Sequence, residues 1–210
     1  SVLSVDSSAA ALERARALGL DTAQIEQNLG DAFQNIGAFA EAIESYRRAL
    51  ERQPLNEAVL ADLARLRWRI GDESPFADLD AAAKAAPQSS APHRIKGMLL
   101  VGAENMEEAA EALAEAVARN PQDSAAQTVL GQTLASLKRF PEAMAAHARA
   151  LDLAPGSDTH RHAFAQTLLM AGDPDQAMRE AERTETINPH NQLTHALKGL
   201  VWRLKGDARE

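Results

Sequence analysis

Histidines and carboxylates are the side chains of this sequence best suited to metal binding or acid–base catalysis. The sequence has six histidines and no cysteine, which excludes disulfides, zinc–thiolate sites and thiol catalysis. His160 and His162 lie two residues apart on an expected helix, so they point to different faces and do not readily share a metal. No His-x-Asp, His-x-Glu or His-Glu-x-x-His arrangement occurs, so the sequence signals of facial-triad iron and zincin sites are missing. We expect surface or groove histidines and no bound metal or other cofactor.

The common motifs of enzyme active sites are missing as well. No G-x-G-x-x-G, P-loop or G-x-S-x-G motif is present, so phosphate cradles and nucleophile elbows are not indicated. Acidic runs such as Glu107-Glu108 fit the first turn of a helix, where negative charge suits the helix dipole. We therefore expect a protein without enzymatic activity.

Composition narrows the class of protein further. The 210 residues carry a net charge of −8 at pH 7, with 45% apolar and 25% charged residues, which is typical of an ordered globular protein. The acidic balance argues against nucleic-acid binding, which needs an excess of Lys and Arg. No apolar run reaches the ~20 residues of a membrane span, and Ser1 to Ala10 lack the regions of a signal peptide, so we expect a cytoplasmic protein without membrane contact. Abundant alanine favours an all-α fold.

Five prolines recur at an almost constant spacing and indicate where helices begin and end. They are spaced by 33, 34, 34 and 34 residues: Pro54, Pro87, Pro121, Pro155 and Pro189. With proline at position 32 of a 34-residue unit, units start at Ala23, Glu57, Ser90, Ser124, Asp158 and Gln192. Each start follows a residue that can cap a helix N-terminus, namely Thr22, Asn56, Ser89, Asp123, Ser157 and Asn191. Such side chains accept a hydrogen bond from an orphan backbone N–H, whereas proline ends the preceding helix.

Small residues also align within the units. Position 8 holds Gly30, Ala64, Gly97, Gly131, Ala165 and Gly199. Position 20 holds Ala42, Ala109, Ala143 and Ala177, and position 27 holds Ala49, Ala82, Ala116 and Ala150. Large apolar residues fill position 7 or 11, and breaks recur near the middle of the units. Each unit is therefore predicted to be two antiparallel helices joined by a short turn.

This pattern resembles the tetratricopeptide repeat (TPR), which has small residues at positions 8, 20 and 27 and proline at position 32. The resemblance covers Ala23 to Glu210 and implies an all-α, right-handed solenoid of antiparallel helix pairs. It predicts five units, at residues 23–56, 57–89, 90–123, 124–157 and 158–191, followed by a capping helix at 192–210. An irregular alanine-rich helical bundle is the alternative, but it would make the proline and cap columns accidental.

Two parts depart from the pattern. Unit 57–89 is one residue short, and its Pro75 fits only the first turn of the second helix, so we expect that helix to be short. Residues 1–22 are predicted to be an N-terminal helix or a degenerate leading repeat, with Ala11, Leu12, Ala15 and Leu18 facing inward.

The resemblance also implies a binding groove, because the first helices of TPR units line a concave surface. The resemblance implies ten candidate groove residues, some of which form a basic stretch on units two and three. They are Gln27, Asp31, Arg65, Trp68, Arg69, Arg94, Met98, Gln132, His162 and Gln166. Gln27 and Asp31 replace the Lys and Asn of the carboxylate clamp that chaperone-binding TPR proteins use, so chaperone tails are not the expected ligands. Arg65, Arg69 and Arg94 favour an acidic peptide or protein segment, although they could instead be solvated and paired with neighbouring aspartates.

The sequence therefore predicts a protein–protein interaction module. Residues Leu197 to Glu210 also resemble the junction found in bacterial proteins that join TPR units to a 2-oxoglutarate/Fe(II) oxygenase domain. That resemblance implies, as an alternative, the non-catalytic recognition half of a larger oxygenase. A third hypothesis is a structural module whose groove is filled by its own N-terminal helix or by a second copy, so a homo-oligomer is a further expectation.

Overall fold

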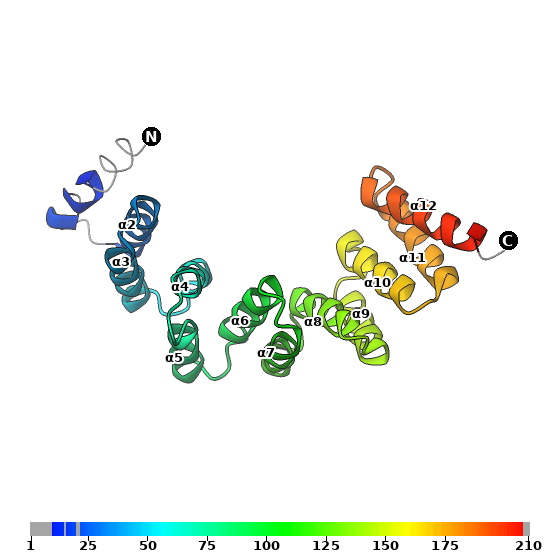
Figure 1. Ribbon diagram of the computed structural model, residues 1–210, viewed down its shortest axis with the longest axis horizontal. Helices are drawn as coiled ribbons and strands as arrows, with labels where there is room; N and C mark the ends of the chain where they lie inside the picture. Colours follow the sequence, from blue (N-terminus) through cyan, green and yellow to red (C-terminus); the bar gives the residue numbers. More distant parts are fainter. Residues whose placement is uncertain (1–9, 15, 20–21, 208–210) are drawn as a thin grey trace. The chain divides into compact units, whose positions relative to one another are not determined.

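The computed structural model describes residues 10–14, 16–19 and 22–207 of the chain. All regular secondary structure in these ranges is helical (Figure 1), which confirms the all-α prediction. The chain divides into two compact units, Ser1–Leu99 and Leu100–Glu210.

The first unit is built of successive helices joined by short turns. Its helices are α2 (Ala23–Ile36), α3 (Phe39–Arg52), α4 (Glu57–Arg69), α5 (Ala77–Ala85) and the part of α6 (Ala91–Gly102) up to Leu99. Helix α3 packs against α2 and α4, and α4 also packs against α5. The described residues 10–14 and 16–17 are helical as well.

The second unit continues the same alternation of helices. Its helices after α6 are α7 (Met106–Arg119), α8 (Ser124–Ser136), α9 (Phe140–Leu153), α10 (Asp158–Met170), α11 (Pro174–Ile187) and α12 (Gln192–Asp207). Helix α8 contacts α7, α9 and α10, while α10 contacts α9, α11 and α12. Each helix thus buries one stripe against its neighbours in sequence, as repeat architectures require.

Five of the six predicted caps and all five prolines lie at helix ends, whereas α6 begins at Ala91 rather than at Ser90 and Ser89 accepts a hydrogen bond from the N–H of Ala91. Thr22, Asn56, Asp123 and Ser157 each accept a hydrogen bond from the backbone N–H three residues later. Helices α3, α5, α7, α9 and α11 each end two residues before one of the five periodic prolines. The residue before a proline disfavours the helical conformation, so each proline column ends its helix.

Small residues let the paired helices approach closely. A Cβ atom on Gly30 would lie 2.5 Å from the Tyr46 ring, and one on Gly131 would lie 2.7 Å from the His147 ring. Contacts this short exclude any side chain larger than glycine without movement of the ring. The alanines at positions 20 and 27 are buried in the same interfaces: Ala42, Ala49, Ala109, Ala116, Ala143, Ala150 and Ala177 are 0% exposed.

Three details differ from the sequence predictions. Helix α5 is short, as expected, but Pro75 lies in the turn before it rather than in its first turn. Of the N-terminal residues expected to face inward, Leu12 is half-buried, whereas Ala11 is exposed and Leu18 is 81% exposed. Ala15 lies outside the described residues.

Candidate binding surface on the first helices

The first helices of the first unit border an open hollow of about 290 Å³. It lies between α4 and α6 and is lined by Glu57, Ala58, Ala61, Arg65, Arg94, Ile95, Met98 and Leu99. Three of the predicted groove residues, Arg65, Arg94 and Met98, therefore lie together. Met98 is 48% exposed and Ile95 is buried, so the hollow combines a partly apolar floor with charged walls.

Neighbouring carboxylates compensate the arginines of this hollow. Arg65 donates a hydrogen bond of 2.7 Å to Asp62, and Arg94 forms an ion pair with Glu57. Arg94 also lies 3.9 Å from the sulfur of Met98. The hollow is thus lined by balanced ion pairs rather than by excess positive charge.

Trp68 and Arg69 extend this surface along the end of α4. The Trp68 ring lies 5.2 Å from the ring of Phe76, centroid to centroid, yet Trp68 is 41% exposed. Its ring therefore supports the irregular second repeat and also presents apolar surface to solvent. The guanidinium of Arg69 lies 5.4 Å from the centroid of the Phe39 ring, in a cation–π contact that holds it toward α3.

The two predicted groove residues on α2 are half-buried. Asp31 accepts a hydrogen bond of 2.6 Å from the hydroxyl of the fully buried Tyr46. Burial and this bond to the aspartate raise the pKa of Tyr46. Asp31 therefore satisfies a buried tyrosine of the paired helix, and Gln27 is the α2 side chain better placed for a ligand.

In the second unit the predicted residues lie on α8 and α10. Gln132 and Gln166 are exposed, whereas His162 is half-buried. Burial lowers the pKa of His162, although the nearby Asp158 opposes this. The three side chains offer neutral hydrogen-bonding groups, in contrast to the ion pairs on α4 and α6.

Two histidines have roles that the sequence did not reveal. His147, expected on the surface or in a groove, is 0% exposed, which corrects that prediction for this residue. Its Nε2 lies 2.9 Å from the hydroxyl of Thr167. His160 lies with Nδ1 2.9 Å from the Thr128 hydroxyl and Nε2 3.1 Å from the Ser124 hydroxyl. These contacts join α9 and α8 to α10, so both histidines stabilise the packing between repeats.

Arg67 is the other polar side chain that sequence reasoning missed. It stands at position 11, where other units place large apolar residues, and its side chain is 9% exposed. It donates hydrogen bonds of 2.9 and 3.2 Å to Asp72 and of 2.5 Å to Asp78. The hydrogen bond from Arg67, with a smaller effect from the backbone N–H of Ser74, lowers the pKa of Asp72. An arginine in an apolar column was the signal that could have identified this network.

Neither a metal centre nor a membrane span is indicated in the described part of the chain. No group of three or more His, Cys, Asp or Glu residues is arranged to hold a metal ion among these residues. Over the same residues, no helix is both long and apolar enough to cross a bilayer.

Two segments match family models of the tetratricopeptide repeat, residues 23–54 and residues 96–158. No curated protein sequence is significantly similar to the chain. Solved structures share its fold. Yeast Tom70 has a TM-score of 0.70 at 17% identity, over 94% of this chain and 43% of Tom70. A tetratricopeptide repeat protein from Parabacteroides merdae has a TM-score of 0.66 at 19% identity, over 89% of this chain and 75% of its own.

A further similar structure is YrrB, described as a TPR protein with an unusual peptide-binding site. Its TM-score is 0.60 at 19% identity, over 91% of this chain and 99% of YrrB. At these identities the likeness concerns the fold alone. Together with the matched segments it confirms the predicted all-α TPR solenoid.

Proposed function

Because the chain is a tetratricopeptide repeat protein, we propose that it binds a peptide or protein segment along the first helices of its repeats and carries out no chemistry itself. The TPR fold supports a protein-interaction module. The proposal that the segment binds along the first helices rests on where the exposed apolar side chains lie. In the first unit, Trp68 near the end of α4 and Met98 on α6 are 41% and 48% exposed.

The second helices show a different surface. Among the described residues of the first unit, Phe39 at the start of α3 is the exposed large apolar residue of the second helices α3 and α5. Aromatic and methionine side chains are adaptable contacts for a bound segment. The apolar surface available for binding therefore follows the first helices.

The hollow between α4 and α6 favours a segment that carries acidic as well as apolar residues. Arg65 and Arg94 can form paired hydrogen bonds with ligand carboxylates once these displace Asp62 or Glu57. Met98, beside both arginines, supplies apolar contact. The ligand class that we propose is an acidic peptide or protein segment with interspersed apolar side chains.

A displayed peptide library tests this proposal. Peptides retained by the wild-type protein are measured again with Arg65→Glu/Arg94→Glu and with Met98→Asp. Each variant should weaken binding at least about tenfold, a loss expected when a contact at the centre of an interface is removed. Arg149→Glu, an exposed charge reversal on the second helix α9, is the matched control and should leave affinity unchanged. Retained peptides that bind all variants equally would refute the site, and failure to retain any peptide would refute peptide binding.

The oxygenase alternative depends only on the resemblance at Leu197 to Glu210. In that setting the same surface would bind the substrate for a separate catalytic domain. The binding experiment therefore applies to both proposed functions. A measurement of oxygenase activity in the longer protein distinguishes them.

A further inference from the structure

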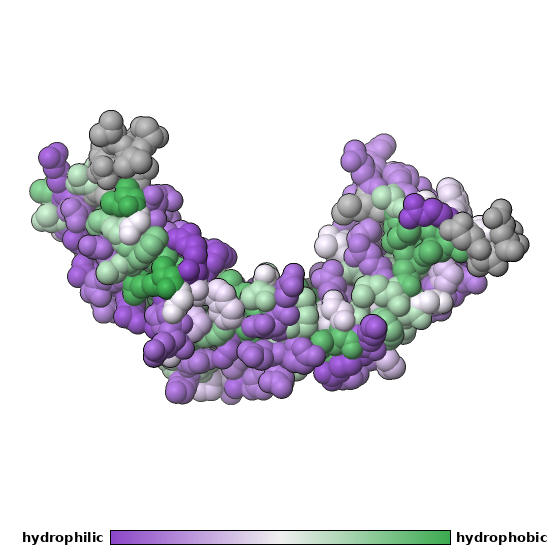
Figure 2. Space-filling model, viewed as in Figure 1, coloured by the Kyte–Doolittle hydropathy of each residue, from purple (hydrophilic) through white to green (hydrophobic). Residues whose placement is uncertain are grey.

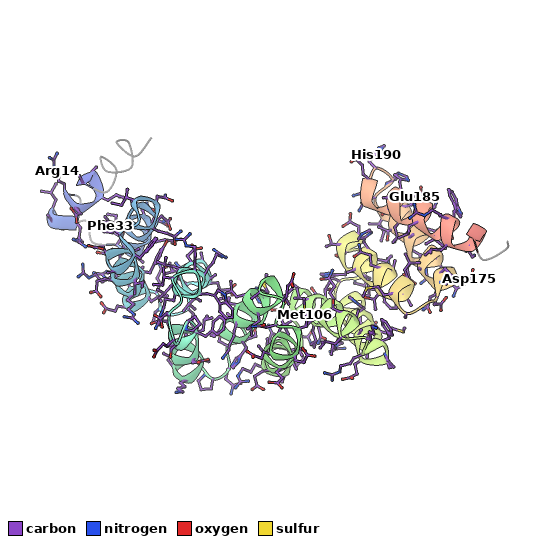
Figure 3. All side chains as sticks on the ribbon, viewed as in Figure 1. Arg14, Phe33, Met106, Asp175, Glu185 and His190 are labelled. Carbon is purple, nitrogen blue, oxygen red and sulfur yellow. The ribbon has the colours of Figure 1, made fainter. Side chains whose placement is uncertain are left out.

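Two of the five methionines of this chain have exposed side chains. Met98 on α6 is 48% exposed, and Met170 at the end of α10 is 54% exposed. Met106, which is labelled in Figure 3, is half-buried. Met144 and Met178 are partly buried against the apolar core of the second unit. Because a thioether is oxidised where an oxidant reaches its sulfur, Met98 and Met170 are the methionines open to such modification.

Met98 differs from Met170 in having a cation beside its sulfur. The Nη1 atom of Arg94 lies 3.9 Å from the sulfur of Met98, as the donor of a weak N–H···S hydrogen bond. The other terminal nitrogen of Arg94, Nη2, forms the ion pair with Glu57, which fixes the guanidinium on this side of α6. In the described part of the chain, Met170 has no contact of this kind.

A guanidinium in this place can assist the oxidation of the thioether by a peroxide. The sulfur lone pair attacks one oxygen of hydrogen peroxide, the O–O bond breaks and an S–O bond forms. The other oxygen leaves as hydroxide and takes up the proton that the first oxygen carried, which gives water. Sulfur is thereby oxidised by two electrons and the peroxide is reduced. An N–H group that is already directed at the sulfur can stabilise the negative charge on the departing oxygen, and Arg94 supplies it.

The sulfoxide would change the surface that Met98 contributes to the hollow between α4 and α6. Figure 2 shows hydrophilic and hydrophobic residues next to one another over these helices. A thioether is a weak hydrogen-bond acceptor, whereas oxidation makes the side chain polar. The new oxygen is bonded to the sulfur, so it can accept a hydrogen bond from Nη1 of Arg94. It would occupy a donor that a ligand carboxylate needs and would remove apolar contact area.

We propose that Met98 is a site of reversible oxidation by peroxides, assisted by Arg94, and that its sulfoxide weakens binding in the hollow. The second part of this proposal rests on the proposed binding of an acidic segment there. Methionine sulfoxide reductases convert the sulfoxide back to the thioether, so binding should return when the protein is reduced. The surface would then hold its ligand under reducing conditions and release it when peroxide accumulates.

Peptide mass spectrometry after timed exposure to hydrogen peroxide tests the first part without any ligand. Met98 should form the sulfoxide at least about threefold faster than the more exposed Met170, the gain expected from one hydrogen bond to the departing oxygen. Arg94→Gln should remove this difference, and Arg94→Lys, which keeps a cationic donor, should retain part of it. Arg149→Gln, at an exposed arginine of α9, is the matched control and should keep the full difference.

Unchanged helical circular dichroism verifies that each variant is folded. Equal oxidation rates at Met98 and Met170 in the wild type would overturn the assistance by Arg94. A rate ratio that Arg94→Gln leaves unchanged would overturn it as well, because exposure alone would then explain the rates.

Binding of a retained acidic peptide without methionine, measured before and after oxidation, tests the second part. Oxidation of the wild type should weaken binding about fivefold or more, because a polar oxygen enters a contact of the interface. The reductases for both sulfoxide epimers should restore the affinity. Met170→Leu should show the same loss as the wild type. Met98→Leu should have the same affinity before and after peroxide treatment, whatever its initial value.

These measurements separate a failure of this inference from a failure of the proposed function. If acidic peptides bind the reduced protein and bind equally well after Met98 is oxidised, the switch is wrong and the proposed binding stands. If the reduced protein retains no acidic peptide, the proposed function is wrong and the switch is wrong with it. The ratio of oxidation rates still decides in that case whether Met98 is an assisted oxidation site.

Discussion

The buried His147 should make the stability of the second unit depend on pH. Its side chain is 0% exposed, and its Nε2 lies 2.9 Å from the Thr167 hydroxyl. Burial, with a smaller effect from the nearby His160, lowers the pKa of His147 from 6.5 to about 4. The folded protein therefore holds this imidazole neutral under conditions in which the unfolded chain protonates it.

The sign and size of the effect follow from this difference in pKa. Between pH 6.5 and about 4 the unfolded state binds a proton that the folded state does not, so the free energy of unfolding decreases as the pH falls. One pKa unit corresponds to about 1.4 kcal/mol, so the total loss attributable to His147 is about 3 kcal/mol. Above pH 6.5 the stabilisation is fully present. Burial also lowers the pKa values of His160 and His162, which act in the same direction.

Urea unfolding at a series of pH values measures this loss. Trp202 reports on the second unit once the other tryptophan of the chain is replaced, by Trp68→Phe. In this background, His147→Phe removes the titrating group and keeps a ring, because the tyrosine ring of Tyr46 already fits the equivalent position. The wild-type unfolding free energy should fall by about 3 kcal/mol more than that of His147→Phe between pH 7 and 4. His190→Gln, at an exposed histidine, is the control. Parallel pH profiles for the wild type and His147→Phe would refute the reasoning.

Three further substitutions test the packing by thermal or urea unfolding. Gly131→Ala should destabilise the protein by about 1–2 kcal/mol. Alanine gains ~1 kcal/mol in helix propensity, but its methyl group overpacks the buried His147 ring, and the overpacking costs more. A gain in stability would contradict the close contact. Arg67→Ala should lower the free energy of unfolding by about 3 kcal/mol. This is the lower end of the range for broken buried ion pairs, because both aspartate partners keep some solvent contact. Arg65→Ala, at an exposed arginine, is the control and should lower it by less than about 1 kcal/mol. Asp123→Ala should cost about 1 kcal/mol by removing the cap of α8, and an unchanged melting temperature would show that another group satisfies that N–H.

The features predicted correctly from the sequence are those that a local, periodic rule determines. Thr22, Asn56, Asp123 and Ser157 cap their helices because a short polar side chain at that point can reach the backbone N–H three residues later. The proline columns end helices through the geometry of their own ring. In the paired helices, small residues at positions 8, 20 and 27 are buried because the two helices of a repeat approach each other closely there. None of these features depends on which side chains neighbouring repeats contribute.

The features that the sequence did not predict depend on such neighbours. Pairing of Arg65 with a neighbouring aspartate was one of two alternatives that the sequence left open, whereas the ion pair of Arg94 with Glu57 was not predicted. The contact from Arg94 to Glu57 joins α6 to α4. The pattern of residues within one helix therefore could not predict it. Arg67 likewise became a buried network because the shortened second repeat places Asp72 and Asp78 within its reach.

Several of these observations concern the side chain at position 24 of a repeat. This side chain lies against the glycine at position 8 of the paired helix, so its identity determines what that close contact contributes. Tyr46 there contributes a buried hydroxyl that needs Asp31 as its acceptor. His147 there contributes an imidazole whose pKa is lowered by burial. At Gly199 of α12 no described atom lies within 4 Å of where a Cβ would be. The stability of these helix pairs and its dependence on pH thus both depend on which residue occupies position 24.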